Sequence, residues 1–208
     1  MRYTGPRNKV SRREGVDLGL KTPGTKGHAT LLKKLTLKPG QHGAGTRKRK
    51  KQSERGKQLR EKQKLRFMFG VTETQLKNYY NEAVNTKGNT GVILGQLLEQ
   101  RLDNVIYRLG FAPTRASSRQ LVNHGHVIVD DKMVSVASYR VVVGDKVAFK
   151  GAKTAKIPYI ETQMANETQI IPEWLERKAE KGKVVKMPDS QNIEKQINMR
   201  SVIEFYSR

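Results

Sequence analysis

The distribution of positive charge constrains this chain more than any other feature of its sequence. The 208 residues carry a formal net charge of +22, and residues 1–66 alone hold 21 Lys and Arg against four Asp and Glu. A compact domain with such a charge repels itself. A polyanion relieves that repulsion, because Lys and Arg then replace its condensed counterions. The first third of the chain is therefore expected to bind a polyanion, and nucleic acid is favoured.

An anionic membrane surface is the alternative partner, and the sequence does not favour it. No run of about eighteen or more apolar residues is present, and residues 1–6 lack the apolar stretch of a secretory signal. The absence of cysteine excludes disulfides and thiolate metal sites. The sequence thus predicts a cytoplasmic protein with no membrane partner and no cofactor.

The N-terminal third consists of two basic segments. Residues 1–45 are rich in Gly, Pro, Thr and Lys, and they predict an extended arm without a core of its own that is poorly ordered without RNA. Five adjacent cations follow, namely Arg47, Lys48, Arg49, Lys50 and Lys51. Such a run is unfavourable in an isolated compact fold. A solvated tail or localisation signal is one interpretation, and a loop that contacts phosphates is favoured once the next helix is considered.

Two helices are predicted beyond this run. The first covers about 53–68, with Ser53 as its N-cap and Gly70 at its end. Its cations point in nearly all directions, and they are Arg55, Lys57, Arg60, Lys62, Lys64 and Arg66. A helix that is polar on most faces needs a polar neighbour, and RNA is one candidate. The second helix covers about 73–85.

Residues 92–150 predict a pair of helices. Apolar residues recur at helical spacing from Leu94 to Leu109 and predict one helix, which carries Arg101, Asn104 and Arg108 on another face. The next helix begins with Thr114 as its N-cap, and Gly125 suits its C-terminal end.

A small antiparallel sheet is predicted to follow these helices. The apolar period changes to two beyond Gly125, which predicts a hairpin whose turn is Asp130-Asp131. An Asp then occupies a left-handed turn position at a small cost in strain. A second strand pair is predicted between residues 139–143 and 146–149.

The start of the second helix has the features of a phosphate site. Arg115 and Arg119 are four residues apart and project together, beside the amides of the helix N-terminus at Thr114. Arginines beside such amides suit a phosphate. In the alternative interpretation these arginines are solvated or pair with Asp103.

The same residues carry a resemblance to a known family. Residues 98–111, Thr114-Arg115 and residues 119–126 resemble the S4 RNA-binding domain. Further motifs, in order along nearly the whole chain, resemble the bacterial-type family of small-ribosomal-subunit protein four. They are residues 11–15, 39–43, 59–64, 78–80, 87–91 and 202–208.

The resemblance implies a non-enzymatic structural component of the small ribosomal subunit. Such proteins bind 16S rRNA early in 30S assembly, lie near the mRNA entry path, touch small-subunit protein five and influence translational accuracy; no homo-oligomer is expected. The implied fold is α+β. A helical domain, residues 46–93 completed by 186–208, follows the arm 1–45, and an S4 module with its return segment, residues 94–185, is inserted into it.

The charge pattern and the resemblance together give the expected RNA-binding residues. They are Arg12, Arg13, Gln41, His42, Arg47, Lys48, Arg49, Lys50, Lys51, Arg55, Arg60, Lys62, Lys64, Arg66, Arg101, Arg108, Thr114, Arg115, Ser118, Arg119, Gln120, His124 and Lys132.

Three other chemistries are less favoured. Many relatives hold the arm with a four-cysteine zinc site, which this chain cannot form. Arg101-Leu102-Asp103 resembles part of the catalytic Gly-Arg-Leu-Asp motif of pseudouridine synthases. However, Gln100 replaces the glycine and the downstream Thr and Gly are absent, so Asp103 is expected to orient an arginine or cap a turn. Trp174 is expected to dock in apolar surroundings at a helix start rather than stack on a base.

Overall fold

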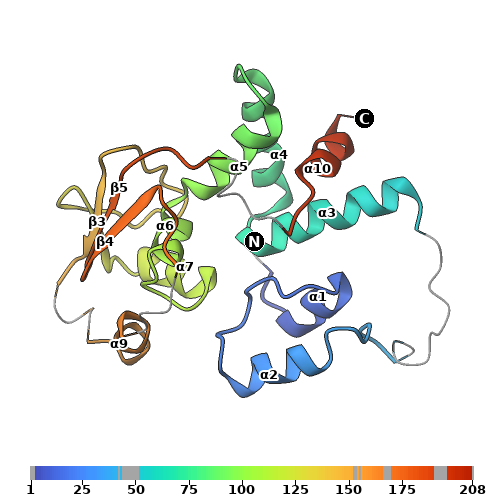
Figure 1. Ribbon diagram of the computed structural model, residues 1–208, viewed down its shortest axis with the longest axis horizontal. Coiled ribbons are helices and arrows are strands. Elements are labelled where there is room, and N and C mark those ends of the chain that lie inside the picture. The colour runs from blue at the N-terminus through green and yellow to red at the C-terminus, as the bar shows by residue number, and fades with distance from the viewer. Residues whose placement is uncertain are drawn as a thin grey trace. The chain divides into compact units, whose positions relative to one another are not determined.

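The chain divides into two compact units. The computed structural model describes residues 3–41, 43, 52–151, 154, 156–165, 170–189 and 196–207. One unit comprises Met1–Asn85 with Lys195–Arg208, and the other comprises Thr86–Glu194. The described part of the first unit is helical, whereas the second contains helices and an antiparallel sheet (Figure 1). The predicted α+β class is confirmed.

The two central helices of the first unit lie where the sequence predicts them. Helix α3 (Glu54–Phe69) begins at Ser53, whose Oγ accepts a hydrogen bond from the amide of Gly56 at 3.1 Å. It ends at Gly70, whose φ of 61° lies in the left-handed region that glycine adopts without steric cost. Helix α4 (Glu73–Asn85) follows directly and buries Leu76 and Ala83.

The C-terminal helix α10 (Met199–Tyr206) packs against α3 (Figure 1). Val202 of α10 is fully buried. The phenol of Tyr206 donates a hydrogen bond to Glu73 Oε1 at 2.8 Å, and its ring stacks on Tyr80 with centroids 4.9 Å apart. Residues separated by more than a hundred positions therefore share one small core.

The expected extended arm is not confirmed for residues 3–41. They contain α1 (Arg7–Glu14) and α2 (Lys26–Lys33), which contact each other. Leu18 and Leu31 are each 1% exposed, so the segment has a small core. The composition of residues 1–45 did not indicate this core, because its few apolar residues lie far apart in the sequence and meet only when the helices pack. Residue 42 and residues 44–45 lie outside the described residues.

The predicted single helix over residues 94–109 is wrong. Two helices, α5 (Thr90–Glu99) and α6 (Leu102–Arg108), are separated by Gln100 and Arg101. Arg101 is extended and forms an isolated β-bridge with Arg140, while the amide of Leu102 donates to the carbonyl of Tyr139 at 2.9 Å. The apolar period continues through the break, so periodicity alone could not reveal it.

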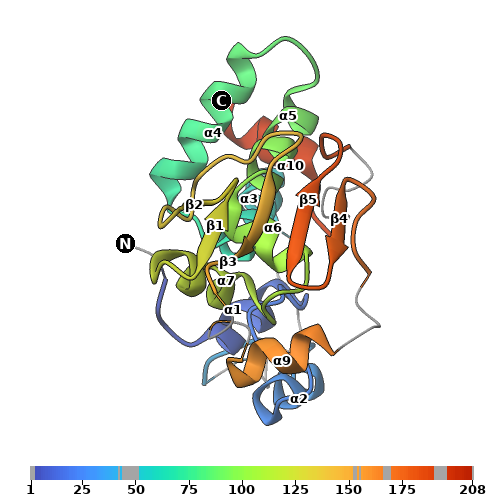
Figure 2. The ribbon, with the colours of Figure 1, turned by 90° about the vertical axis from the view of Figure 1, so that its left-hand side faces the viewer.

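The second unit contains a five-stranded sheet in the order β2-β1-β3-β5-β4 (Figure 2). The strands are β1 (Val127–Val129), β2 (Lys132–Met133), β3 (Lys146–Phe149), β4 (Leu175–Lys178) and β5 (Lys181–Val184). The β1–β2 turn has Asp130 at φ 46° and Asp131 at φ 63°, which confirms the predicted left-handed turn.

The predicted pairing of residues 139–143 with 146–149 is wrong. Strand β3 pairs instead with β1 and with β5, which lies in the segment expected only to lead back to the helical domain. The partner of β3 is thus more than thirty residues further along the chain, a pairing that no local turn signal indicates.

The core of the second unit lies between the sheet and its helices. Buried residues of α6 and of α7 (Arg115–Asn123) meet Val127, Val129, Val147 and Phe149 from one sheet face. Trp174 is fully buried in the same cluster, as is Ile160 of α9 (Pro158–Met164). Apolar docking of Trp174 is therefore confirmed, although a strand rather than a helix follows it.

Candidate nucleic-acid interface

Asp103 lies between two arginines of the second unit. Arg101 donates from Nε to Oδ1 at 3.1 Å and from Nη2 to Oδ2 at 2.9 Å. Arg119 donates from Nε to Oδ2 at 2.7 Å and also pairs through Nη2. The side chain of Asp103 is only 3% exposed, whereas that of Arg119 is 13% exposed. Asp103 thus orients two guanidinium groups. The alternative interpretation, that Arg115 and Arg119 pair with Asp103, is confirmed for Arg119, whereas Arg115 donates to Asn104.

A second buried carboxylate orients the remaining arginines. Arg108 donates to both oxygens of Glu99, at 3.0 and 2.7 Å. Asn104 donates from Nδ2 to Glu99 Oε2 at 2.7 Å and accepts from Arg115 Nε at 2.8 Å. The guanidinium of Arg115 also lies over the ring of Tyr107, 4.5 Å from its centroid. We call Arg101, Arg108, Arg115 and Arg119, with Glu99, Asp103 and Asn104, the arginine cluster.

The arginine cluster retains positive charge at a partly covered surface. Among the seven residues of the cluster, four carry a guanidinium group and two a carboxylate. Paired hydrogen bonds to carboxylates fix the guanidinium planes of Arg101, Arg108 and Arg119, while Asn104 and the ring of Tyr107 hold Arg115. Only Arg108, with 19% of its side chain exposed, and Arg119 present substantial edges to solvent, because Arg101 and Arg115 are buried. An anion would therefore meet oriented guanidinium edges.

More of the polar groups at the start of α7 form hydrogen bonds within the protein than the sequence suggests. Thr114 is its N-cap, as predicted: Oγ1 accepts from the amide of Ser117, and the Ser117 hydroxyl accepts from the amide of Thr114 at 3.1 Å. This capping box uses both amides internally. The hydroxyl of Ser118 donates to the carbonyl of Thr114 at 3.2 Å and is fully buried. The contacts shown by Thr114 and Ser118 are therefore internal to the protein.

The other expected residues of the second unit are exposed. They are Gln120 and His124 at the end of α7 and Lys132 on β2.

Among the described residues, no group of three His, Asp or Glu side chains could hold a metal ion. None of the described helices has the length and apolar character of a membrane span.

In the first unit, the polar neighbours of α3 are partly protein side chains. Ion pairs join Arg60 to Glu14 at 3.0 Å, Lys62 to Glu73 at 2.7 Å and Lys64 to Glu61 at 2.6 Å. These three cations therefore have protein carboxylates as polar neighbours and do not need RNA for that purpose.

The remaining expected cations of the first unit differ in their surroundings. Arg66 lies 4.6 Å from the ring centroid of Phe67, and Arg12 donates to the carbonyls of Leu37 and Lys38. Exposed positions are Arg13, Gln41 and Arg55. His42 and the run Arg47, Lys48, Arg49, Lys50 and Lys51 lie outside the described residues.

Two carboxylates of the first unit have shifted pKa values with opposite signs. Burial raises the pKa of Glu14 above its ordinary value, although Arg60 opposes this shift. Burial also acts to raise the pKa of Glu73, but hydrogen bonds from Lys62 and Tyr206 outweigh it and hold the pKa below the ordinary value. Glu73 therefore remains charged as a partner for the cations of α3.

Sequence reasoning missed two members of the interface. Glu99 is the last residue of the apolar helix α5 and lies nine residues from Arg108, a separation at which no helical periodicity pairs them. Tyr107 lies beneath Arg115 although eight residues separate them. The motif around Asp103 provided the only available signal, and it pointed to the correct role for that carboxylate.

The fold and the arginine cluster define a class of protein, that of S4-domain proteins. Residues 100–147 match the family described as "S4 domain", and residues 2–99 match "Ribosomal protein S4/S9 N-terminal domain". Relatives named small ribosomal subunit protein uS4 match nearly end to end. The protein of Akkermansia muciniphila is 47% identical, and those of Herpetosiphon aurantiacus and Natranaerobius thermophilus are each 46% identical. Each match covers 100% of this chain and 99% of the relative.

The chain belongs to the family of small ribosomal subunit protein uS4. That family comprises structural proteins of the ribosome, not enzymes. In agreement with this, the aspartate that resembles a pseudouridine synthase catalytic residue is buried between two arginines rather than open to a substrate.

Proposed function

We propose that this chain is a structural component of the small ribosomal subunit, in the cytoplasm, and binds 16S rRNA through the arginine cluster. One observation carries the proposal: two buried carboxylates, Glu99 and Asp103, orient guanidinium groups that outnumber them two to one. Such groups are fixed before RNA arrives, so little side-chain entropy is lost on binding.

The exposed edges of Arg108 and Arg119 are the groups that would meet RNA phosphates. Each phosphate neutralised by a cation releases about 0.7 to 0.9 of a counterion. These contacts would position the protein on RNA without identifying a base. Arg101 and Arg115 are buried, so their role is to hold the cluster and to add to its positive potential. The exposed residues Gln120, His124 and Lys132 of the second unit would add further contacts.

The finer parts of the proposal follow from the family resemblance and the basic run. The chain would bind 16S rRNA early and help nucleate 30S assembly. The run Arg47–Lys51 would lie near the mRNA entry path, and small-subunit protein five would be a neighbour of the chain. In this position the chain would influence translational accuracy. The division into an arm (1–45), a helical domain (46–93 with 186–208) and an inserted S4 module (94–185) is part of the same proposal.

Binding of a 16S rRNA fragment over a range of salt concentrations tests the role of the arginine cluster. Replacing Arg108 and Arg119 with Gln should flatten the plot of log affinity against log salt by about one to two units. The pair Arg108→Lys and Arg119→Lys keeps both charges and should preserve the slope. Circular dichroism must show both variants folded, and an unchanged slope in the folded Gln variant would contradict the proposal.

Crosslinking tests the placement of the basic run. A photoreactive group in the downstream part of a bound message should reach residues 47–51 in the assembled subunit. Crosslinks from this run to rRNA alone would place it away from the mRNA path.

A further inference from the structure

The sheet of the second unit has one face that its described helices leave uncovered. Figure 2 shows the five strands with α6 and α7 behind them. Lysine is the most frequent residue at the strand positions that face away from those helices. We call this surface the outer sheet face, and it comprises Lys146, Lys178, Lys181, Lys183 and Glu176 with the apolar residues Ile128, Met133 and Ala148. Lys150 follows β3 directly, and its Nζ lies 3.3 Å from Met133 Sδ.

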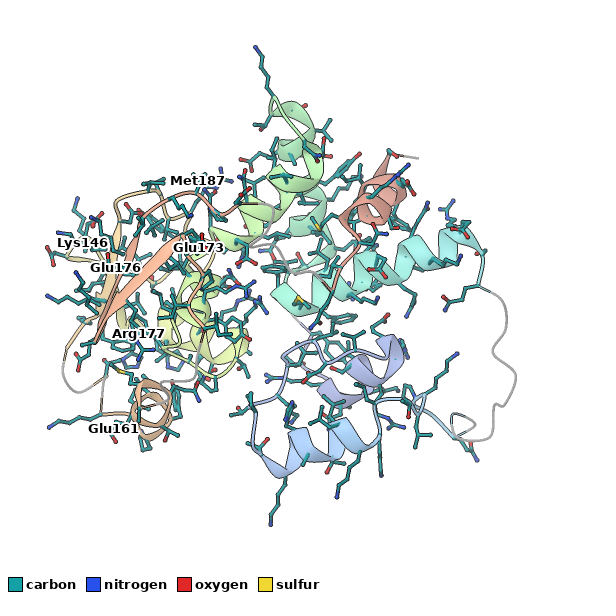
Figure 3. All side chains as sticks on the ribbon, viewed as in Figure 1. Lys146, Glu161, Glu173, Glu176, Arg177 and Met187 are labelled. Carbon is teal, nitrogen blue, oxygen red and sulfur yellow. The ribbon has the colours of Figure 1, made fainter. Side chains whose placement is uncertain are left out.

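The alternation of β5 fixes the direction of its lysines. A Cβ placed on Gly182 would lie 2.3 Å from Leu109 Cδ1, so the backbone of β5 is pressed against helix α6 at that point. Successive residues of a strand point to opposite faces. Lys181 and Lys183 therefore point away from α6, and both are exposed. Figure 3 shows Lys146 and Glu176 on the same outer side.

The outer sheet face is electrostatically unfavourable in the free protein. Lys146 and Lys183 are directly opposite each other on adjacent strands, an arrangement that destabilises a sheet when the charges are alike. Among the described residues, Lys146, Lys181 and Lys183 have no carboxylate as an ion-pair partner. The nearest acid in the register, Glu176, pairs with Lys178 at 3.1 Å.

Protection of a sheet edge does not explain these lysines. Lysine on an edge strand prevents two sheets from pairing edge to edge. Strands β3 and β5 are the third and fourth of the five, and each is paired on both sides. Their lysines therefore bring a like-charge cost without the benefit that lysine gives at an edge.

We propose that the outer sheet face is a second RNA-binding surface, which contacts the phosphate backbone of rRNA on the side of the sheet opposite α6 and α7. The inference rests on the proposed function, because it takes rRNA as the polyanion. Charge complementarity favours this partner, because Lys146, Lys181 and Lys183 present exposed ammonium groups on one face of the sheet. Lysine acts as a flexible point charge, which suits phosphates rather than base edges.

The test uses the full chain, 16S rRNA and two triple variants with equal loss of charge. The test variant carries Lys146→Gln, Lys181→Gln and Lys183→Gln. The control carries Lys87→Gln, Lys156→Gln and Lys186→Gln, which lie in the same unit but off the outer sheet face. The test variant should remain folded, since it loses a like-charge contact.

For the test variant, the slope of log affinity against log salt should be smaller than that of wild type by about two to three units. From 50 to 200 mM salt, wild type should lose roughly 15- to 65-fold more affinity than this variant. The control should keep most of the wild-type slope. Acetylation of lysines, followed by mass spectrometry, should show Lys146, Lys181 and Lys183 protected in the rRNA complex and reactive in the free protein.

Equal slopes for the two triple variants, with reactive Lys146, Lys181 and Lys183 in the complex, would overturn the inference while leaving the proposed function intact. Protection of these lysines only in the assembled subunit, and not on rRNA, would also overturn it and would indicate an acidic protein partner. Failure of wild type to bind 16S rRNA in preference to an unrelated RNA would instead refute the proposed function.

Discussion

Replacing Asp103 with Asn tests whether the arginine cluster is a preorganised site or only a local excess of charge. The substitution keeps the shape of the side chain but removes the charge that lies between Arg101 and Arg119. Both guanidinium groups would then face each other across a neutral amide, whose nitrogen cannot accept the hydrogen bonds that one carboxylate oxygen now receives.

The expected loss of stability follows from the burial of the partners. The side chains of Asp103 and Arg101 are 3% and 4% exposed. Removing one partner of such a pair typically costs about 3–5 kcal/mol, because an uncompensated charge remains buried. Arg119 is more exposed and can be rehydrated, so its contribution is smaller. A domain with a stability of about 5–15 kcal/mol would remain folded under mild conditions.

Urea unfolding and 16S rRNA binding measured on the same variant provide the assay. Asp131→Asn is the matched control, since it removes an equal charge from an exposed turn residue with φ 63°, which Asn tolerates. Asp103→Asn should lower the unfolding midpoint and weaken RNA binding. The control should retain stability and bind RNA at least as tightly as wild type.

The direction of the binding change separates the two explanations. If only net charge mattered, removing an acid would strengthen binding in both variants. An Asp103→Asn protein that is as stable as wild type and binds rRNA as tightly would refute the reasoning that Asp103 orients the cluster. Arg119→Lys, which preserves charge but loses the fork-shaped pair, should show a weaker form of the same defect.

Three further predictions concern packing and protonation. Because the folded-state pKa of Glu14 is raised, the contribution of Glu14 to stability should fall as pH rises from below 4.5 toward neutrality, so the Glu14→Gln variant should gain stability relative to wild type over this range in pH-dependent urea unfolding. Tyr206→Phe removes a hydrogen bond to the Glu73 carboxylate and should cost about 1.5–3 kcal/mol in the same assay. Gly182→Ala should lower the thermal midpoint through overpacking of about 1–3 kcal/mol, and the double variant with Leu109→Ala should lose less stability than the sum of the two single losses, because the smaller side chain relieves the contact.

The sequence by itself determined the features that depend on neighbouring residues. Ser53 and Thr114 begin helices because each hydroxyl accepts a hydrogen bond from the amide three residues later, and Gly70 ends a helix because glycine adopts that left-handed backbone without steric cost. The turn at Asp130-Asp131 belongs to the same group. The concentration of charge in residues 1–66 also needs no fold to be visible, and the motifs of the S4 module identified the family.

Only the tertiary structure decided which distant groups meet. The helix breaks at Arg101 because Arg101 forms a β-bridge with Arg140 and because carbonyls of the 137–139 segment accept hydrogen bonds from the amides of Leu102 and Asp103. The pairing of β3 with β5 and the burial of Glu99 beside Arg108 likewise join residues that no turn or helical period connects. An apolar or charge pattern records which side of an element is buried, but not what buries it. For that reason the sequence identified the arginines, whereas the fold determined that buried carboxylates hold them.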